Sequence, residues 1–236
     1  MLLFYVRHGD PIYSPDSLTD LGLRQAEAVA KRLALHGIDE IYASTSNRAI
    51  QTATPLSQIV KKEIVQLEWC NEGHVWKEFT CTSGNTTFWI WGVDKTRNLL
   101  NSPEVLSLGE KWYEHAGFEE KVGKGMQRIN RETDAFLESL GYAHNRESNT
   151  YKAINPNNKR IALFAHQGFG LAFLSSLLDI PYPLFSTRFD ISHSCVTVIE
   201  FPDCEGEHIP TVLQLSNDSH IYREGLPTKY NNRIFL

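Results

Sequence analysis

The sequence predicts an α/β fold in which a mostly parallel sheet carries helices on both of its faces. Strand-like and helix-like segments alternate along the first part of the chain, the order that right-handed crossovers between parallel strands produce. Residues 2–6 form a continuous apolar run, as strands buried on both faces do. A chain of 236 residues with 42% hydrophobic residues can also bury a substantial core.

The first segments follow in the order strand, helix, strand, helix, strand. After the strand at 2–6, Thr19 is an N-cap candidate for a helix whose apolar residues recur at three- and four-residue spacing. Residues 38–43 predict a second strand, and the N-cap candidates that follow it put Arg48 in the first turn of a second helix. A third, short strand is expected near residues 63–67.

Residues 73–125 interrupt this regular pattern. Four tryptophans lie here among many polar residues: Trp76, Trp89, Trp91 and Trp112. The segment is either an irregular surface insertion with a small core of its own or a lid over an active site. We favour the lid, because long insertions in compact enzymes often close such sites.

Regular order resumes after the insertion. Apolar spacing predicts a helix that ends at Gly141, a strand at 160–165 and a buried helix at 168–178. Further strands are expected at 196–201 and 211–215. We therefore expect a single three-layer domain over residues 1–236, with a cap insertion at about 73–125.

Composition excludes several function classes. The chain has 23 basic and 28 acidic residues, a net charge of −5, and no basic run, so a nucleic-acid backbone is not an expected partner. No apolar stretch approaches the ~20 residues that span a bilayer, and the apolar start lacks the basic region of a signal peptide. A cytoplasmic protein with no membrane partner is expected, and its four cysteines are expected to be free thiols.

Three polar features stand where strands of the predicted sheet end. Arg7-His8-Gly9 follows the first strand, Arg48 follows the second, and His166 follows the strand at 160–165. Each alone is ordinary, since an arginine near a helix start is usually a surface charge and a histidine beside a strand is usually structural. Together they lie at the edge where open α/β sheets bind ligands.

Two arginines and two histidines at one point predict an anion site. Arginine forks match phosphate oxygens, and a neutral imidazole whose other nitrogen donates a hydrogen bond can act as a nucleophile. This suggests attack of His8 on a phosphoryl group, with Arg7, Arg48 and a protonated His166 neutralising the equatorial oxygens. Gly9 lacks a Cβ and would let the backbone approach the ligand closely.

Four blocks of sequence carry a family resemblance. They are Arg7-His8-Gly9 with the later LTDLGLRQA at 18–26, YAS at 42–44 with RAIQTA at 48–53, the strand that ends in His166, and residues 194–197. In this order the blocks resemble those of the histidine phosphatase superfamily, which is also called phosphoglycerate-mutase-like. The resemblance covers about residues 1–60 and 158–201.

The resemblance implies a role for each matching residue. It makes His8 the phosphorylated nucleophile, and Arg7, Arg48 and His166 match residues of the phosphate pocket. The family also has an acidic proton donor between the second block and the insertion. Its usual order, a strand, a short turn, a glutamate and then a glycine, favours Glu72 over Glu68.

Two departures from the family pattern bear on function. Tyr13-Ser14 stands where the mutase branch usually has Trp-Asn, which favours a phosphatase and leaves Ser14 as a possible substrate contact. Gln167 follows the second histidine where a glycine is common, and its backbone N–H is a candidate phosphate contact.

We therefore expect a metal-independent phosphatase that hydrolyses a small phosphomonoester through a phosphohistidine on His8, without a cofactor. Glu72 would protonate the leaving oxygen and then take a proton from water, which needs a pKa raised by burial. Three alternatives stay open: a phosphoglycerate-type mutase, a non-catalytic phosphate-binding protein, and a metallohydrolase using His8, Asp10 and His166.

Overall fold

The computed structural model describes residues 1–228 and has a central six-stranded sheet, in the order β13-β11-β1-β10-β4-β5. The strands are β1 (Leu2–Arg7), β4 (Glu40–Ser44), β5 (Ile64–Leu67), β10 (Arg160–Ala165), β11 (Val196–Glu200) and β13 (Thr211–Asn217). β1, β10, β4 and β5 are parallel, whereas β11 is antiparallel to both of its neighbours. The predicted α/β class with a mostly parallel sheet is confirmed.

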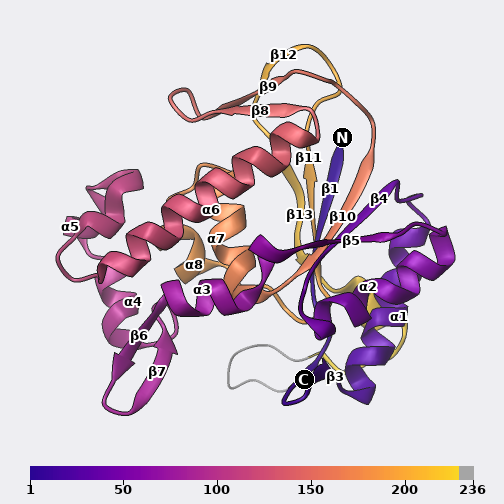
Figure 1. Ribbon diagram of the computed structural model, residues 1–236, viewed down its shortest axis with the longest axis horizontal. Coiled ribbons are helices and arrows are strands. Elements are labelled where there is room, and N and C mark those ends of the chain that lie inside the picture. The colour runs from indigo at the N-terminus through magenta and orange to yellow at the C-terminus, as the bar shows by residue number, and fades with distance from the viewer. Residues whose placement is uncertain (229–236) are drawn as a thin grey trace.

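Helices cover both faces of this sheet (Figure 1). Alternate residues of β1 show the two layers, since Phe4 and Val6 belong to one core and Leu3 and Tyr5 to another. The first core includes apolar side chains of α1 (Asp20–Ala34) and α2 (Asn47–Val60). The second includes those of α6 (Glu120–Ser139), α7 (Gln167–Leu177) and α8 (Tyr182–Arg188).

The segments predicted outside the insertion match these elements to within a few residues. Thr19 is the N-cap of α1, and its hydroxyl accepts a hydrogen bond from the Gly22 N–H at 3.0 Å. Arg48 is the second residue of α2, whose N-cap is Ser46. All four cysteines are free thiols, as expected.

Residues 73–125 contain regular structure that the apolar spacing did not indicate, and the favoured lid over an active site stays a prediction. This part of the chain folds into several short elements: α3 (Glu72–Glu78), β6 (Thr80–Ser83), β7 (Thr86–Trp89), α4 (Asp94–Leu100), α5 (Pro103–Leu106) and the 3₁₀ helix η2 (Gly109–Glu114). The 20-residue helix α6 already begins at Glu120. The other elements are 4 to 7 residues long, too short for a hydrophobic period to show.

The insertion also has no core of its own. Its buried side chains, among them Phe79 and Trp112, belong to the same cluster as Leu3 and Tyr5 of the central sheet. Trp112 stacks on Tyr182 of α8 with 5.1 Å between the ring centroids. The segment is therefore packed onto the sheet layer and held in place by it.

Small elements that the sequence did not predict complete the fold. They are the hairpin β2 (Pro11–Tyr13) and β3 (Asp16–Leu18), the three-stranded sheet of β8 (Tyr142–Asn145), β9 (Thr150–Ala153) and β12 (Gly206–His208), the short 3₁₀ helix η1 (Glu68–Cys70), and α9 (Ser219–Arg223). Within residues 1–228, none of the helices combines the length and apolar composition needed to cross a bilayer.

Candidate active site

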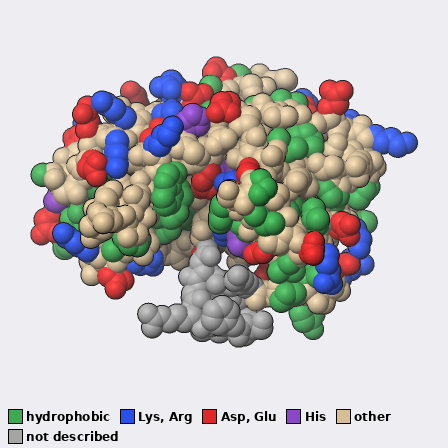
Figure 2. All heavy atoms as spheres, turned by 60° about the horizontal axis from the view of Figure 1, so that its bottom comes forward, with side chains coloured by type: hydrophobic (Ala, Val, Ile, Leu, Met, Phe, Trp, Pro, Cys, Tyr) green, Lys and Arg blue, Asp and Glu red, His purple; other side chains and the backbone are tan. Residues whose placement is uncertain are grey.

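The parallel strands bring the predicted polar features to one edge of the sheet. Arg7 is paired in register with Ala165, the residue before His166, and β4 ends beside them at Ser44. This edge opens into a cavity of about 770 Å³ whose walls include Arg7, His8 and Arg48. Figure 2 shows acidic, basic and histidine side chains together in the hollow near the centre of that face.

His8 is buried and held as a neutral imidazole. Its Nδ1 lies 2.7 Å from the Gly9 carbonyl oxygen, which can only accept a hydrogen bond, so Nδ1 carries the proton and Nε2 keeps its lone pair. Burial, together with His166 and Arg7, holds the pKa of His8 well below its usual value of 6.5. The ring is therefore neutral, with the Nε2 lone pair available.

Gly9 packs closely on α1. A Cβ on Gly9 would lie 2.6 Å from the Gly22 carbonyl oxygen, so the missing side chain permits this packing, and the expected close approach of the backbone to a ligand stays a prediction. Its N–H donates to the Thr52 hydroxyl at 3.0 Å. These contacts fix the turn that follows His8.

The two arginines are buried by different partners. Arg7 donates to the Ile191 carbonyl at 2.5 Å and to His193 Nε2 at 2.8 Å. Arg48 donates from Nη1 to Asp16 Oδ1 at 2.7 Å. In residues 1–228 the Nε groups of both arginines are buried without a hydrogen-bond partner, so each can still donate to an anion.

His166 is fully buried at the N-cap of α7. Its Nε2 lies 2.7 Å from the Ser44 hydroxyl, and its ring centroid is 5.2 Å from that of His8. Burial, then Arg48 and Arg7, lower the pKa of His166 well below 6.5. These effects favour a neutral His166 in the free site, whereas the expected protonated His166 belongs to the site with a phosphoryl group bound and stays a prediction.

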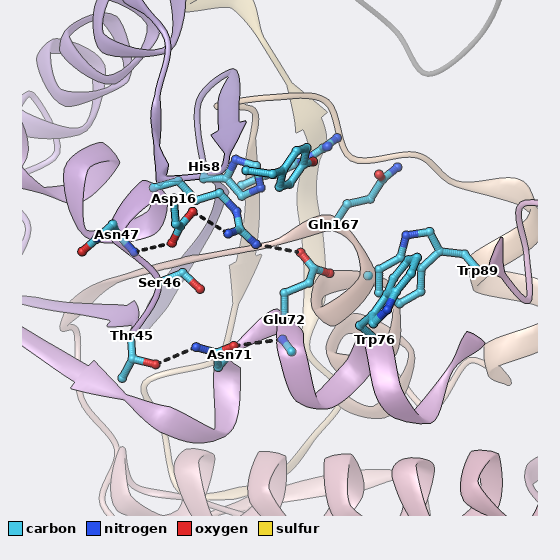
Figure 3. A pocket seen from close by; sticks show the side chains of 15 residues that line it. His8, Asp16, Thr45, Ser46, Asn47, Asn71, Glu72, Trp76, Trp89 and Gln167 are labelled. Carbon is cyan, nitrogen blue, oxygen red and sulfur yellow. Dashed lines mark hydrogen bonds and ion pairs between the residues drawn. The ribbon is translucent and has the colours of Figure 1, made fainter. Parts of the chain in front are cut away.

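Glu72 faces this group from the first turn of α3. Its Oε2 lies 3.2 Å from His166 Nδ1 and 3.9 Å from Arg48 Nη2, and its Oε1 accepts from the Phe169 N–H at 3.3 Å. Figure 3 shows the carboxyl group pointing into the cavity. Burial raises the pKa of Glu72, although Arg48 and Arg7 act in the opposite direction.

The other acidic candidates lie elsewhere. The Glu68 side chain is 68% exposed and bonds to the Thr45 hydroxyl and to His74. Glu78 forms a bidentate pair with Arg128. Of these three glutamates, Glu72 is the one that the fold brings to His166.

Gln167 and Ser14 differ in position. Gln167 begins α7 and lines the cavity, and its side-chain amide donates to Asp190. Ser14 is exposed in the turn between β2 and β3 and does not line the cavity, whereas its neighbours Tyr13 and Asp16 do.

Sequence reasoning missed several residues of this site. Asp16, Ser44 and His193 hold Arg48, His166 and Arg7 respectively. Trp76 and Trp89 form part of the cavity wall and belong to the segment expected to be a lid, although neither was expected individually as a site residue. Ser44 could have been predicted from the sequence, because it ends a strand at the same edge of the sheet. The others come from a hairpin, a loop and the insertion, whose placement no local pattern indicates.

The site also brings together three groups that could ligate a metal ion. One ligand atom each of His8, Glu72 and His166 lie within 4.8 Å of one another. Asp10, expected in such a set, instead bonds to the Thr19 hydroxyl at 2.9 Å and lies 3.6 Å from His193. The guanidinium of Arg48, 3.9 Å from Glu72, disfavours a cation here.

A comparison with protein families finds a match in the first third of the chain. Residues 3–83 match the sequence profile of the "Histidine phosphatase superfamily (branch 1)". No curated protein matches the chain.

Solved structures with the same fold span nearly the whole chain. A phosphoserine phosphatase from Entamoeba histolytica, in complex with 3-phosphoglyceric acid, superposes with a TM-score of 0.58 at 19% identity, covering 93% of this chain and 98% of that one. An alpha-ribazole phosphatase from Shigella flexneri gives 0.59 at 18%, covering 92% and 97%. A mycobacterial glucosyl-3-phosphoglycerate phosphatase gives 0.57 at 17%, covering 91% and 98%.

The profile match contains Arg7, His8 and Arg48, and the shared fold extends over the rest of the described chain. Residues 3–83 are therefore similar to the histidine phosphatase superfamily (branch 1), and the chain shares its fold with these solved phosphatase structures.

Proposed function

We propose that this protein is a phosphatase that hydrolyses small phosphomonoesters through a phosphohistidine on His8, without a metal ion or a cofactor. One observation carries the proposal. The neutral His8, with its Nε2 lone pair available, lies among two buried arginines and a glutamate whose pKa is raised. This arrangement has a nucleophile, an anion pocket and a proton donor within one cavity.

The reaction follows from these positions in two steps. His8 Nε2 attacks phosphorus, the bond from phosphorus to the alcohol oxygen breaks, and the Glu72 carboxyl group gives its proton to that oxygen. Water then attacks the phosphohistidine while the Glu72 carboxylate takes a proton from it. The phosphorus–nitrogen bond breaks, which releases inorganic phosphate and restores both side chains.

The charged groups around phosphorus stabilise the transition state. Arg7 and Arg48 donate to the equatorial oxygens, and the backbone N–H of Gln167 at the start of α7 is a further donor. A bound phosphate dianion would favour the protonated form of His166, which is neutral in the free site. Ser44 and His193 hold His166 and Arg7 in position.

A His8→Ala variant tests the mechanism. We expect it to lose turnover of p-nitrophenyl phosphate while its circular dichroism spectrum stays unchanged. The wild-type protein, denatured in alkaline detergent during turnover, should carry phosphate on His8 that withstands alkali and is released by acid. Label on a serine, cysteine or aspartate, or substantial activity in the variant, would refute this mechanism.

The same assay separates the alternatives. Loss of activity in EDTA would favour the metallohydrolase, now with Glu72 in place of Asp10 as the third ligand. No turnover of any phosphomonoester would favour a non-catalytic phosphate-binding protein. Return of the phosphoryl group to another hydroxyl of the substrate, rather than release of phosphate, would indicate a mutase. The cavity of about 770 Å³ leaves room for water beside a small substrate and favours hydrolysis.

A further inference from the structure

The cavity has room for much more than a phosphate group, and its remaining walls are of two kinds. One wall is aromatic and consists of Trp76 from α3 and Trp89 from β7. The other includes the uncharged polar side chains Thr45, Ser46 and Asn47, from the start of α2 and the loop before it. Figure 3 shows the two walls on opposite sides of Glu72.

The aromatic wall begins at the proposed proton donor. A Cβ on Gly168 would lie 2.6 Å from both Glu72 Oε1 and Trp89 Cη2, so the carboxyl group and the indole meet at one point of α7. The Trp76 and Trp89 rings pack edge to face, with centroids 4.8 Å apart, and Trp91 stacks on Trp89 at 4.4 Å. An alcohol that receives its proton from Glu72 therefore lies along these indoles.

The cavity has little capacity for a second anionic group. Among residues 1–228, the arginines and lysines that line it are Arg7 and Arg48, and both face the phosphate pocket. A second carboxylate or phosphate on the substrate would lose its hydration beside the indoles without gaining a cationic partner. Such desolvation of an unpaired charge is strongly unfavourable.

An adjacent hollow does not supply a cationic partner for a second anionic group. It shares Trp89 and Gln167 with the main cavity and is lined by Arg97 and Arg188. Arg97 donates to the backbone carbonyls of Trp91 and Thr187, and Arg188 donates to the Asn101 side chain. Two aspartates line the same hollow and offset the positive charge: Asp94 and Asp190.

We propose that the preferred substrates are monophosphates of uncharged alcohols that carry a ring, whose flat apolar face stacks on Trp76 and Trp89. The proposal rests on the phosphatase function and adds a substrate class to it. Aromatic rings and sugar rings both present such a face to an indole, and the polar wall can bond to ring substituents. Substrates with a second anionic group should be poor.

Substrate pairs test the proposal on the wild-type protein. Benzyl phosphate and ethyl phosphate release alcohols of similar basicity but differ in the ring, and we expect kcat/KM to be roughly 10-fold higher for benzyl phosphate. Glycerol 3-phosphate and 3-phosphoglycerate differ in one carboxylate, and the carboxylate should lower kcat/KM by at least about 10-fold. Glucose 6-phosphate, as a further substrate, distinguishes a preference for sugars from one for aromatic rings.

A pair of variants assigns the effect to the wall. Trp76→Ala should lower kcat/KM for benzyl phosphate by roughly 10-fold more than it lowers kcat/KM for ethyl phosphate. Phe88→Ala is the control, because Phe88 precedes Trp89 on β7, is 37% exposed and does not line the cavity. Phe88→Ala should leave kcat/KM unchanged for both substrates.

The outcomes separate this proposal from the proposed function. If no phosphomonoester is hydrolysed, the proposed phosphatase function is wrong. Calorimetry then still tests the aromatic wall, because benzylphosphonate should bind roughly 10-fold more tightly than ethylphosphonate. If phosphomonoesters are hydrolysed but ethyl phosphate or 3-phosphoglycerate is the best substrate, the function stands and the substrate class is wrong.

Discussion

A Glu72→Gln variant keeps the shape of the side chain but has no acidic proton to give to a leaving oxygen. In the native protein this carboxyl group is held by the Phe169 N–H, lies 3.2 Å from His166, and has its pKa raised by burial. The amide can occupy the same place and still accept the bond from Phe169. The substitution therefore removes proton donation and one potential negative charge.

The leaving group decides how much this loss matters. An alkoxide is a poor leaving group without a proton, and general acid catalysis contributes on the order of 10²–10⁴-fold. We therefore expect kcat/KM for ethyl phosphate to fall by at least about 10²-fold in Glu72→Gln. With p-nitrophenyl phosphate the leaving phenolate needs little help, so its formation should change far less.

The charge change is common to both substrates. Glu72 Oε2 lies 3.9 Å from Arg48 Nη2, so the amide alters the electrostatics of the phosphate pocket for any phosphate ester. Loss of the base for the water step is also common to both and affects kcat, whereas kcat/KM reports only the steps up to phosphohistidine formation. The ratio of the two kcat/KM decreases therefore isolates proton donation to the leaving oxygen. Single-turnover measurements of phosphohistidine formation report the same step directly.

Glu68→Gln is the matched control. Its carboxyl group is exposed and bonds to Thr45 and His74, away from His166, so both substrates should react at nearly the wild-type rate. The reasoning is refuted if Glu68→Gln shows the leaving-group dependence and Glu72→Gln does not. If neither variant shows it, the proton comes from another group and the proposed role of Glu72 is wrong.

Three further predictions concern charge, pH and stability. Arg48→Lys keeps the charge but loses the planar fork, so kcat/KM should fall on the order of 10²-fold, and near wild-type kinetics would contradict a phosphate contact. Because the pKa of His8 is held well below 6.5, kcat/KM should not fall between pH 7.5 and 6.5, and an acidic decrease centred at 6.5 would oppose this assignment. Burial acts to lower the pKa of His144, but hydrogen bonds to Asp134 and Asp179 raise it above its usual value. The protonated His144 therefore stabilises the fold fully below pH ~6.5, and this stabilisation is lost as the pH rises through the folded-state pKa. The free energy of unfolding lost in His144→Gln, roughly 1–3 kcal/mol in urea at pH 5.5, should therefore shrink at pH 9, and an equal loss at both pH values would contradict the linkage.

The sequence by itself determined the sheet and the four residues at its edge. Apolar runs such as residues 2–6 and the spacing after Thr19 are local signals, because a buried strand or an amphipathic helix must repeat its apolar residues with a fixed period. Parallel strands then place whatever follows them at one edge. On that basis the sequence alone predicts that four residues lie together: Arg7, His8, Arg48 and His166.

The proposal of Glu72 as proton donor needed more than the local pattern. The order of strand, turn, glutamate and glycine favoured Glu72, but burial separates it from Glu68, which is only four residues away. Burial depends on α7 packing over the start of α3, where Gly168 leaves room for both Glu72 and Trp89. The spacing of apolar residues within 67–73 does not indicate this packing.

Only the tertiary structure decided what surrounds the four edge residues. The contacts of Arg7 with His193, of Arg48 with Asp16 and of the phosphate pocket with Trp89 join parts of the chain that are 32 or more residues apart. Such contacts depend on how loops and short elements pack, which side-chain periodicity does not encode. The neutral state of His166 has the same origin, because the pKa of a buried histidine follows from its desolvation and from charges that the fold brings near it.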